Sequence, residues 1–194
     1  MSNVSISTNK LSIGYGETLV QSDLTFSLNT GEMVCMLGPN GCGKSTLLRT
    51  LAGLLPPLGG EFVINQPSNL QTSKPSNSGS AAQSIALVLT ERLSMDNTTV
   101  HDVVALGRYP YSSFLDGLKA EDADIIFQSL REVGFGEAEE VAGTFFNAHS
   151  DGEKQRILIA KALAQQTPII LLDEPTAHLD LPHRILVLRL LEAR

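Results

Sequence analysis

The sequence has few cysteines, few basic residues and no long apolar run, and each shortage excludes a class of protein. The two cysteines, Cys35 and Cys42, form no disulfide framework, so a reducing cytosol fits the composition. Because no run reaches about 18 apolar residues, we expect no membrane-spanning helix. Residues 1–10 also lack the charged-then-apolar layout of a signal peptide. The sequence therefore predicts a soluble cytosolic chain.

The shortage of basic residues argues against nucleic acid as a partner. Lys and Arg number 14 against 21 Asp and Glu, which gives a formal net charge of -7. A nucleic-acid surface needs clustered cations, and here they are scattered. A local phosphate site is not excluded. The 194 residues are 42% hydrophobic, enough for one core or for one core with a small added subdomain.

The spacing of apolar residues predicts a mixed α/β fold. Residues 4–28 alternate apolar and polar side chains, which indicates antiparallel strands, and a further strand is expected at 61–64. Continuous apolar runs are typical of strands buried on both faces, and they occur at residues 33–37, 85–89 and 169–172. Helical spacing predicts helices at 46–55, across 99–166 and from 185, whereas the polar stretch 66–80 is expected to be an exposed loop.

A glycine-rich loop follows the first apolar run and matches the pattern G-x-x-x-x-G-K-[ST]. It consists of Gly38, Pro39, Asn40, Gly41, Cys42, Gly43, Lys44, Ser45 and Thr46. Its glycines let backbone N–H groups approach phosphate oxygens, and the helix that follows adds its positive dipole end. We expect Lys44 to contact the terminal phosphates and the Ser45 hydroxyl to bind Mg2+. The alternative is a chance glycine-rich turn, but the loop stands between a predicted strand and a helix, as a phosphate loop must.

An acidic pair, Asp173 and Glu174, follows the apolar run at 169–172. A strand that ends on Asp173 can present the carboxylate to a magnesium ion. Glu174, one residue further, can orient or deprotonate an attacking water. Alone, such a pair is more often a solvated turn; its presence behind a phosphate loop favours the catalytic interpretation.

A third motif opens the helix that precedes this strand. Ser150 and Glu153 fit the S-x-x-E capping box, which satisfies two backbone N–H groups. For an isolated S-x-x-E the purely structural role is the better interpretation. The position after an inserted helical segment and before the Asp173 strand favours a functional role as well.

In their order along the chain, these motifs resemble the ABC ATPase family over nearly the whole length. The resemblance implies a P-loop ABC ATPase core with an N-terminal antiparallel β subdomain and an inserted α-helical subdomain, binding ATP and Mg2+. It implies that Tyr15 stacks on adenine and that Asp180 lies in the loop after the acidic pair. Ser150, Gly152 and Glu153 would then form the signature that contacts the ATP held by a partner subunit.

The resemblance also implies partners. Two such subunits form a homodimer and sandwich ATP between the phosphate loop of one and the signature helix of the other. Residues 99–111 and 181–184 are similar to importers of iron-siderophore, haem or cobalamin complexes. This branch implies transmembrane permease subunits, indirectly a solute-binding protein, and a peripheral position on the cytoplasmic face of the cell membrane.

Three features depart from the family pattern. Ser150 and Gly152 are kept, but Asp151 and Glu153 add negative charge near an anion site, unless capping turns Glu153 toward the helix backbone. His149 replaces an apolar residue and needs a polar partner. Where the family has a glutamine after the strand at 85–89, this chain has Thr90, whose hydroxyl remains a candidate metal ligand.

The family also has a switch histidine beyond the last helix seen here, and His183 precedes that helix. We therefore expect a C-terminally truncated single domain, 1–194, impaired in turnover. Its expected parts are the β subdomain with the first part of the core (1–94), a helical subdomain (95–165) and the rest of the core (166–194). Two alternatives stay open: a soluble ABC ATPase outside transport, and a nucleotide-binding fragment without turnover.

Overall fold

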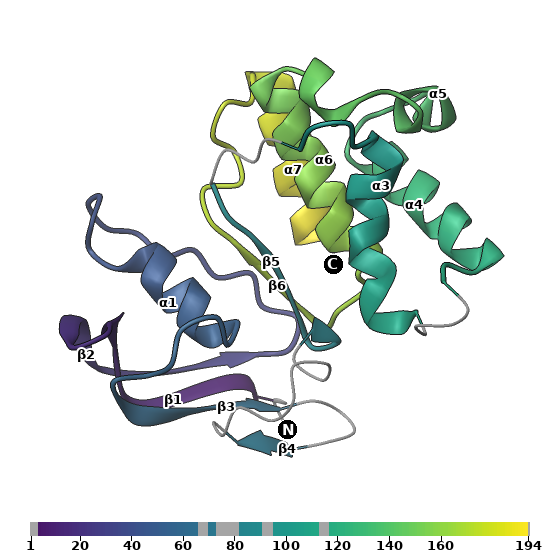
Figure 1. Cartoon of the computed structure of the whole chain (residues 1–194). Coiled ribbons are helices and arrows are strands. Elements are labelled where there is room, and N and C mark those ends of the chain that lie inside the picture. Colours follow the sequence, from purple (N-terminus) through teal and green to yellow (C-terminus); the bar gives the residue numbers. More distant parts are fainter. Residues whose placement is uncertain (1–3, 66–69, 73–81, 91–94, 113–116, 194) are drawn as a thin grey trace.

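A curved antiparallel sheet forms one side of the molecule (Figure 1). The computed structural model describes residues 4–65, 70–72, 82–90, 95–112 and 117–193. The strands β1 (Val4–Tyr15) and β2 (Thr18–Asn29) pair as a hairpin, as the alternating pattern predicted. The other edge of β1 pairs with β3 (Gly59–Asn65), and β4 (Leu70–Thr72) completes the order β2-β1-β3-β4.

A parallel pair of strands stands between two hydrophobic cores. In β5 (Ile85–Val88) and β6 (Ile169–Leu172), alternate side chains face opposite directions. Ile85 and Leu171 join a core with β1 and with the helix α1 (Lys44–Leu51). Ala86 and Val88 join the core of the helices on the other face. The continuous apolar runs therefore indicated strands buried on both faces, and the structure confirms this for β5 and β6.

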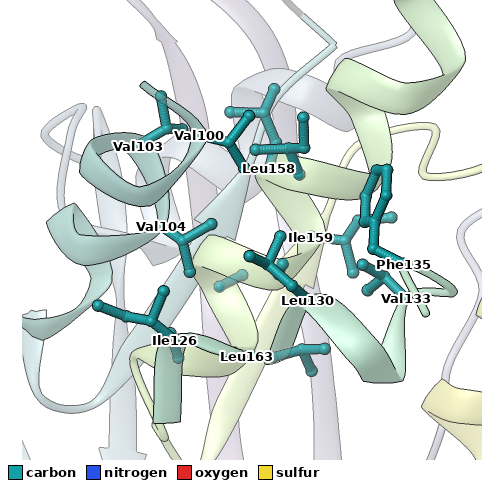
Figure 2. Close-up of a cluster of buried hydrophobic side chains, with 14 of the residues drawn as sticks. Val100, Val103, Val104, Ile126, Leu130, Val133, Phe135, Leu158, Ile159 and Leu163 are labelled. Atoms are coloured by element: carbon teal, nitrogen blue, oxygen red, sulfur yellow. The ribbon is translucent and has the colours of Figure 1, made fainter. Parts of the chain in front are cut away.

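The described residues of the segment 99–166 are mostly helical, as its spacing predicted, and they cover the second face of β5 and β6 (Figure 1). Its elements are α3 (Val100–Ala105), the 3-10 turn η1 (Leu106–Tyr111), α4 (Ala120–Glu132), α5 (Ala138–Ala142), η2 (Phe146–Ala148) and α6 (Asp151–Ala164). Figure 2 shows Val104 of α3, Leu130 of α4 and Ile159 of α6 in one cluster of buried side chains. Each such side chain contributes about 1.5–3 kcal/mol when fully buried. The last helix, α7 (Leu181–Glu192), adds Val187 to this cluster.

A buried ion pair joins the helical elements to one another. Arg108 of η1 donates through Nε to Asp122 Oδ1 of α4 at 2.7 Å. Its Nη1 donates to the Ala164 carbonyl oxygen at 2.8 Å, at the end of α6. The Lys119 backbone N–H and the Arg108 guanidinium lower the pKa of Asp122, so this carboxylate stays charged. Removal of either partner would leave a buried charge unpaired.

Three predictions about elements were wrong. Residues 33–37 form no strand: Met33 is 55% exposed and Leu37 is 94% exposed. A buried strand needs neighbours, and within the described residues β5 and β6 pair only with each other. The helix predicted for 46–55 is α1, which ends at Leu51 because Gly53 takes a left-handed conformation with φ +76°. Part of the polar stretch 66–80 pairs as β4, and the rest lies outside the described residues.

Candidate functional site

The glycine-rich loop opens α1 without any side-chain cap. Gly43 is the N-cap residue and has φ +99°, a conformation that strains any residue with a Cβ. A Cβ at this position would also lie 2.8 Å from Val20 Cγ1 of β2. No acidic residue occupies the first turn of α1. The start of this helix therefore presents unpaired backbone N–H groups and its positive dipole end to an anion.

The Lys44 side chain folds back over the loop. Its Nζ donates to the carbonyl oxygens of Gly38 at 2.9 Å and Pro39 at 3.0 Å. The loop is held from the other side by β2, because Gln21 Nε2 donates to the Cys42 carbonyl oxygen at 3.1 Å. The ammonium charge therefore lies within the loop, where terminal phosphates would need it.

Tyr15 lies at the tip of the β1–β2 hairpin and contacts α1. Tyr15 is 44% exposed, and its hydroxyl accepts hydrogen bonds from Arg49 Nη1 at 3.0 Å and from Thr46 Oγ1 at 3.4 Å. Tyr15, which is predicted to stack on adenine, therefore contacts α1, the helix that follows the phosphate loop.

Asp173 and Thr90 lie together where β6 and β5 end. The Asp173 backbone N–H donates to the Val88 carbonyl oxygen at 2.9 Å, and Thr90 Oγ1 donates to the Asp173 carbonyl oxygen at 2.8 Å. Asp173 is 9% exposed, whereas Glu174 is exposed and takes a left-handed backbone with φ +47°. A left-handed glutamate is uncommon and directs the chain sharply out of the strand.

The oxygen donors near this strand end fit Mg2+. The described residues hold no group of three or more His, Cys, Asp or Glu side chains that could bind a metal by themselves. Mg2+ prefers one or two protein oxygens, with substrate phosphates and waters completing its octahedron. The Asp173 carboxylate and the Ser45 hydroxyl match that requirement. Leu47 of α1 and Leu171 of β6 share one core, so the phosphate-loop helix and the Asp173 strand are packed in the same cluster.

The start of α6 is fully capped, which confirms the predicted capping box. The Glu153 carboxylate accepts from the Ser150 backbone N–H at 2.9 Å and from Ser150 Oγ at 2.8 Å. These hydrogen bonds, backbone first, lower the pKa of Glu153, with smaller contributions from His149 and Arg156. His149 finds its polar partner in Thr144, whose Oγ1 lies 2.7 Å from Nε2.

Gly152 permits a close approach of the segment after the acidic pair. A Cβ at this position would lie 2.8 Å from the His178 carbonyl oxygen. Asp180, two residues further, caps α7: Asp180 Oδ1 accepts from the His183 backbone N–H at 3.1 Å and lies 2.5 Å from His183 Nδ1. His183 thus lies in the first turn of α7, which begins at Leu181 and not, as expected, at residue 185. The start of α6 and the Asp180 loop form one unit.

The predicted residues fall into two groups in space. Tyr15, the phosphate loop and the Asp173 strand surround α1, while Ser150, Gly152 and Asp180 surround the start of α6. The two helix starts lie well apart in Figure 1. Within a single chain, the group around the start of α6 therefore lies apart from the phosphate loop.

Two residues around the loop had not been predicted, Gln21 and Arg49. Arg49 lies three residues after Thr46, so helical spacing placed both on one face of α1. Gln21 gave no signal, because its contact depends on bulges in the pairing of β1 with β2.

A glycine-rich loop at an uncapped helix start, beside a strand that ends in an acidic pair, defines the class of P-loop nucleotide-binding proteins. The family model described as ABC transporter matches residues 21–177, and the chain belongs to this family.

Known relatives agree with this assignment. The chain is 43% identical over 180 residues to an uncharacterised ABC transporter ATP-binding protein of Methanocaldococcus jannaschii, covering 93% of this chain and 60% of the relative. It is 38% identical over 188 residues to the iron(3+)-hydroxamate import ATP-binding protein FhuC of Bacillus subtilis, covering 97% and 67%.

A solved dimeric bacterial ABC transporter cassette has a similar fold, with a TM-score of 0.82 and 27% identity, covering 96% of this chain and 81% of that one. The chain spans about 60 to 67% of the length of the curated relatives it matches. Among the described helices, none has the length and apolar character needed to cross a membrane.

Proposed function

We propose that this chain is the ATP-binding and ATP-hydrolysing subunit of an ABC importer. The observation that carries the proposal is the uncapped start of α1, with Lys44 Nζ held over the loop at 2.9 Å from the Gly38 carbonyl oxygen. An anion with several phosphates satisfies both the backbone N–H groups and the ammonium.

The chemistry is in-line attack of a water on the terminal phosphate of ATP, which forms the new P–O bond as the bond to the leaving ADP breaks and releases phosphate. Lys44 neutralises charge on the transferred phosphoryl group, while Ser45 and Asp173 would hold Mg2+. When bound, Mg2+ supplies electrostatic stabilisation of the phosphate oxygens. Glu174, exposed just beyond Asp173, orients the water and accepts its proton.

The same proposal includes partners. FhuC, by its name, serves import of iron(3+)-hydroxamate, and we extend that class to iron-siderophore, haem or cobalamin complexes. The working unit is a homodimer at the cytoplasmic face of the membrane, bound to permease subunits and served by a solute-binding protein. The separation of the two site groups in one chain supports the dimer, because each group then completes a site with its partner.

A second candidate is a module that binds ATP without turnover. Thr90 favours it: the residue stands where the family has a longer glutamine, and its hydroxyl already donates to the Asp173 carbonyl oxygen at 2.8 Å.

One experiment separates the two candidates. MgATP affinity and phosphate release are measured on the same sample of the chain, at chain concentrations above and below the one at which dimers form. Binding with release that rises with dimer concentration supports the importer ATPase. Binding without release favours the second candidate, and the absence of MgATP binding contradicts both.

A further inference from the structure

The β1–β2 hairpin is tied to the phosphate loop at separate points. At its tip, the Tyr15 hydroxyl accepts from Arg49 Nη1 at 3.0 Å and from Thr46 Oγ1 at 3.4 Å. Further along β2, Gln21 Nε2 donates to the Cys42 carbonyl oxygen at 3.1 Å. The hairpin is therefore held in a defined position relative to α1.

These contacts leave the Tyr15 ring accessible while fixing its end. Tyr15 as a whole is 44% exposed, so part of its side chain is open to contact with a flat ligand. An exposed aromatic side chain ordinarily changes rotamer on the ps–ns timescale. Because two donors from one helix hold the hydroxyl, the ring keeps its place before any ligand arrives. A platform that is ordered in advance loses less entropy on binding.

Arg49 and Lys44 belong to the same helix. Five residues of α-helix rise about 7.5 Å, so α1 sets a fixed spacing between the ammonium that faces phosphates and the guanidinium that holds the ring. A mononucleotide has this polarity, with phosphates at one end and a flat base at the other. Bases stack readily on aromatic rings.

We propose that Arg49 is a positioning residue for base recognition, acting through the Tyr15 hydroxyl. The inference rests on the proposed function, since it assumes that the phosphate loop binds ATP. Arg49 lies outside the phosphate-loop motif. The proposal assigns it to the base end of the ligand, so its loss should leave the affinity for the phosphates unchanged.

The test compares a ligand that has a base with one that has none. Affinities for MgATP and for magnesium tripolyphosphate are measured on the wild-type chain, Arg49→Met, Tyr15→Phe and the double variant. Stacking on an aromatic ring contributes on the order of 5- to 150-fold in affinity. If Arg49→Met loses part of this stacking contribution, it should bind MgATP about fivefold more weakly than wild type. Its affinity for tripolyphosphate should stay within about twofold of wild type.

Tyr15→Phe removes the hydroxyl and keeps the ring, so it should weaken MgATP binding at least as much as Arg49→Met, since the Thr46 contact is lost as well. The double variant should bind MgATP no more weakly than Tyr15→Phe, because Tyr15→Phe already removes the contact with Arg49. Arg49→Lys should restore part of the affinity. Arg189→Met, on the exposed side of α7, removes the same charge elsewhere and should leave both affinities unchanged.

Equal weakening of both ligands by Arg49→Met would overturn the proposal, because the guanidinium would then act through charge or folding. Unchanged affinity for both ligands would overturn it too. In either case the phosphate-loop function stands as long as the wild-type chain binds tripolyphosphate. If the wild-type chain binds neither ligand, the proposed function itself fails.

Discussion

The starts of α1 and α6 have the same helix dipole but opposite chemistry. At α1 the N-cap is Gly43, no side chain caps the helix, and the first turn has no acidic residue. At α6 the cap is Ser150 in a complete capping box, and Asp151 and Glu153 stand in the first turn. The first helix start is open to an anion, whereas the second is already satisfied by its own carboxylate.

The two helix starts differ in what an anion would meet there. The Ser150 hydroxyl donates to Glu153 at 2.8 Å, so a phosphate at α6 would have to compete with a negative charge. The α1 start has no such competitor and has Lys44 over it. We therefore expect a single chain to bind ATP through α1 alone.

The largest expected effect lies beyond both helix starts, at Glu174. Glu174→Gln keeps the size of the side chain and removes the base, so turnover should fall on the order of a hundredfold or more while MgATP binding is retained. Phosphate release and nucleotide affinity are measured together. Turnover at the parent rate would remove Glu174 from the mechanism.

A methyl group at Gly152 should disrupt the packing at the start of α6. The added Cβ would lie 2.8 Å from the His178 carbonyl oxygen, which is backbone and cannot turn away. Gly152→Ala should lower the free energy of unfolding by about 1–3 kcal/mol, measured by urea denaturation. Gly136→Ala is the control, because a Cβ there meets nothing within 4 Å. Equal stability of the two variants would contradict this close packing.

The sequence predicted elements well where a local rule was sufficient. The capping box of Ser150 and Glu153 depends on a spacing of three residues, and the strands β5 and β6 depend on a short apolar run. The same rule failed for residues 33–37, because burial of a strand depends on which neighbours it finds, and a run of five residues does not encode them.

Site residues on the motifs could be located from spacing, but contacts between distant segments could not. Arg108 gave no signal, since its partners Asp122 and Ala164 lie 14 and 56 residues away. The contact of Gln21 with the phosphate loop depends on strand register. Such contacts depend on tertiary structure, so residues of this kind are identified from the three-dimensional structure and not from the sequence.

Ser150→Ala sharpens the comparison by making α6 resemble α1 at its cap. Loss of an N-cap hydroxyl typically lowers stability by about 1 kcal/mol, and we expect that loss in the free energy of unfolding. Ser150→Thr, which keeps the hydroxyl, should recover most of it. A wild-type stability in Ser150→Ala would mean that the cap contributes nothing.

The smallest effect is a dependence on pH at the same cap. Hydrogen bonds from Ser150 lower the pKa of Glu153 from its usual value of 4.5. The folded carboxyl thus takes up a proton at lower pH than the unfolded one, so its stabilisation is present above 4.5 and is lost as the pH falls through the lowered pKa. The stability difference between wild type and Glu153→Gln should shrink between pH 6 and about pH 3. A constant difference would show that the charge of Glu153 is not what stabilises the cap.

The most direct measurement is MgATP affinity at chain concentrations too low for dimer formation, compared for Lys44→Ala and Ser150→Ala. If α1 alone holds the nucleotide, Lys44→Ala abolishes measurable binding, because Lys44 is the residue whose ammonium lies against the loop. Ser150→Ala then binds within about twofold of wild type. Unchanged affinity in Lys44→Ala, or a loss in Ser150→Ala equal to that in Lys44→Ala, would contradict the account.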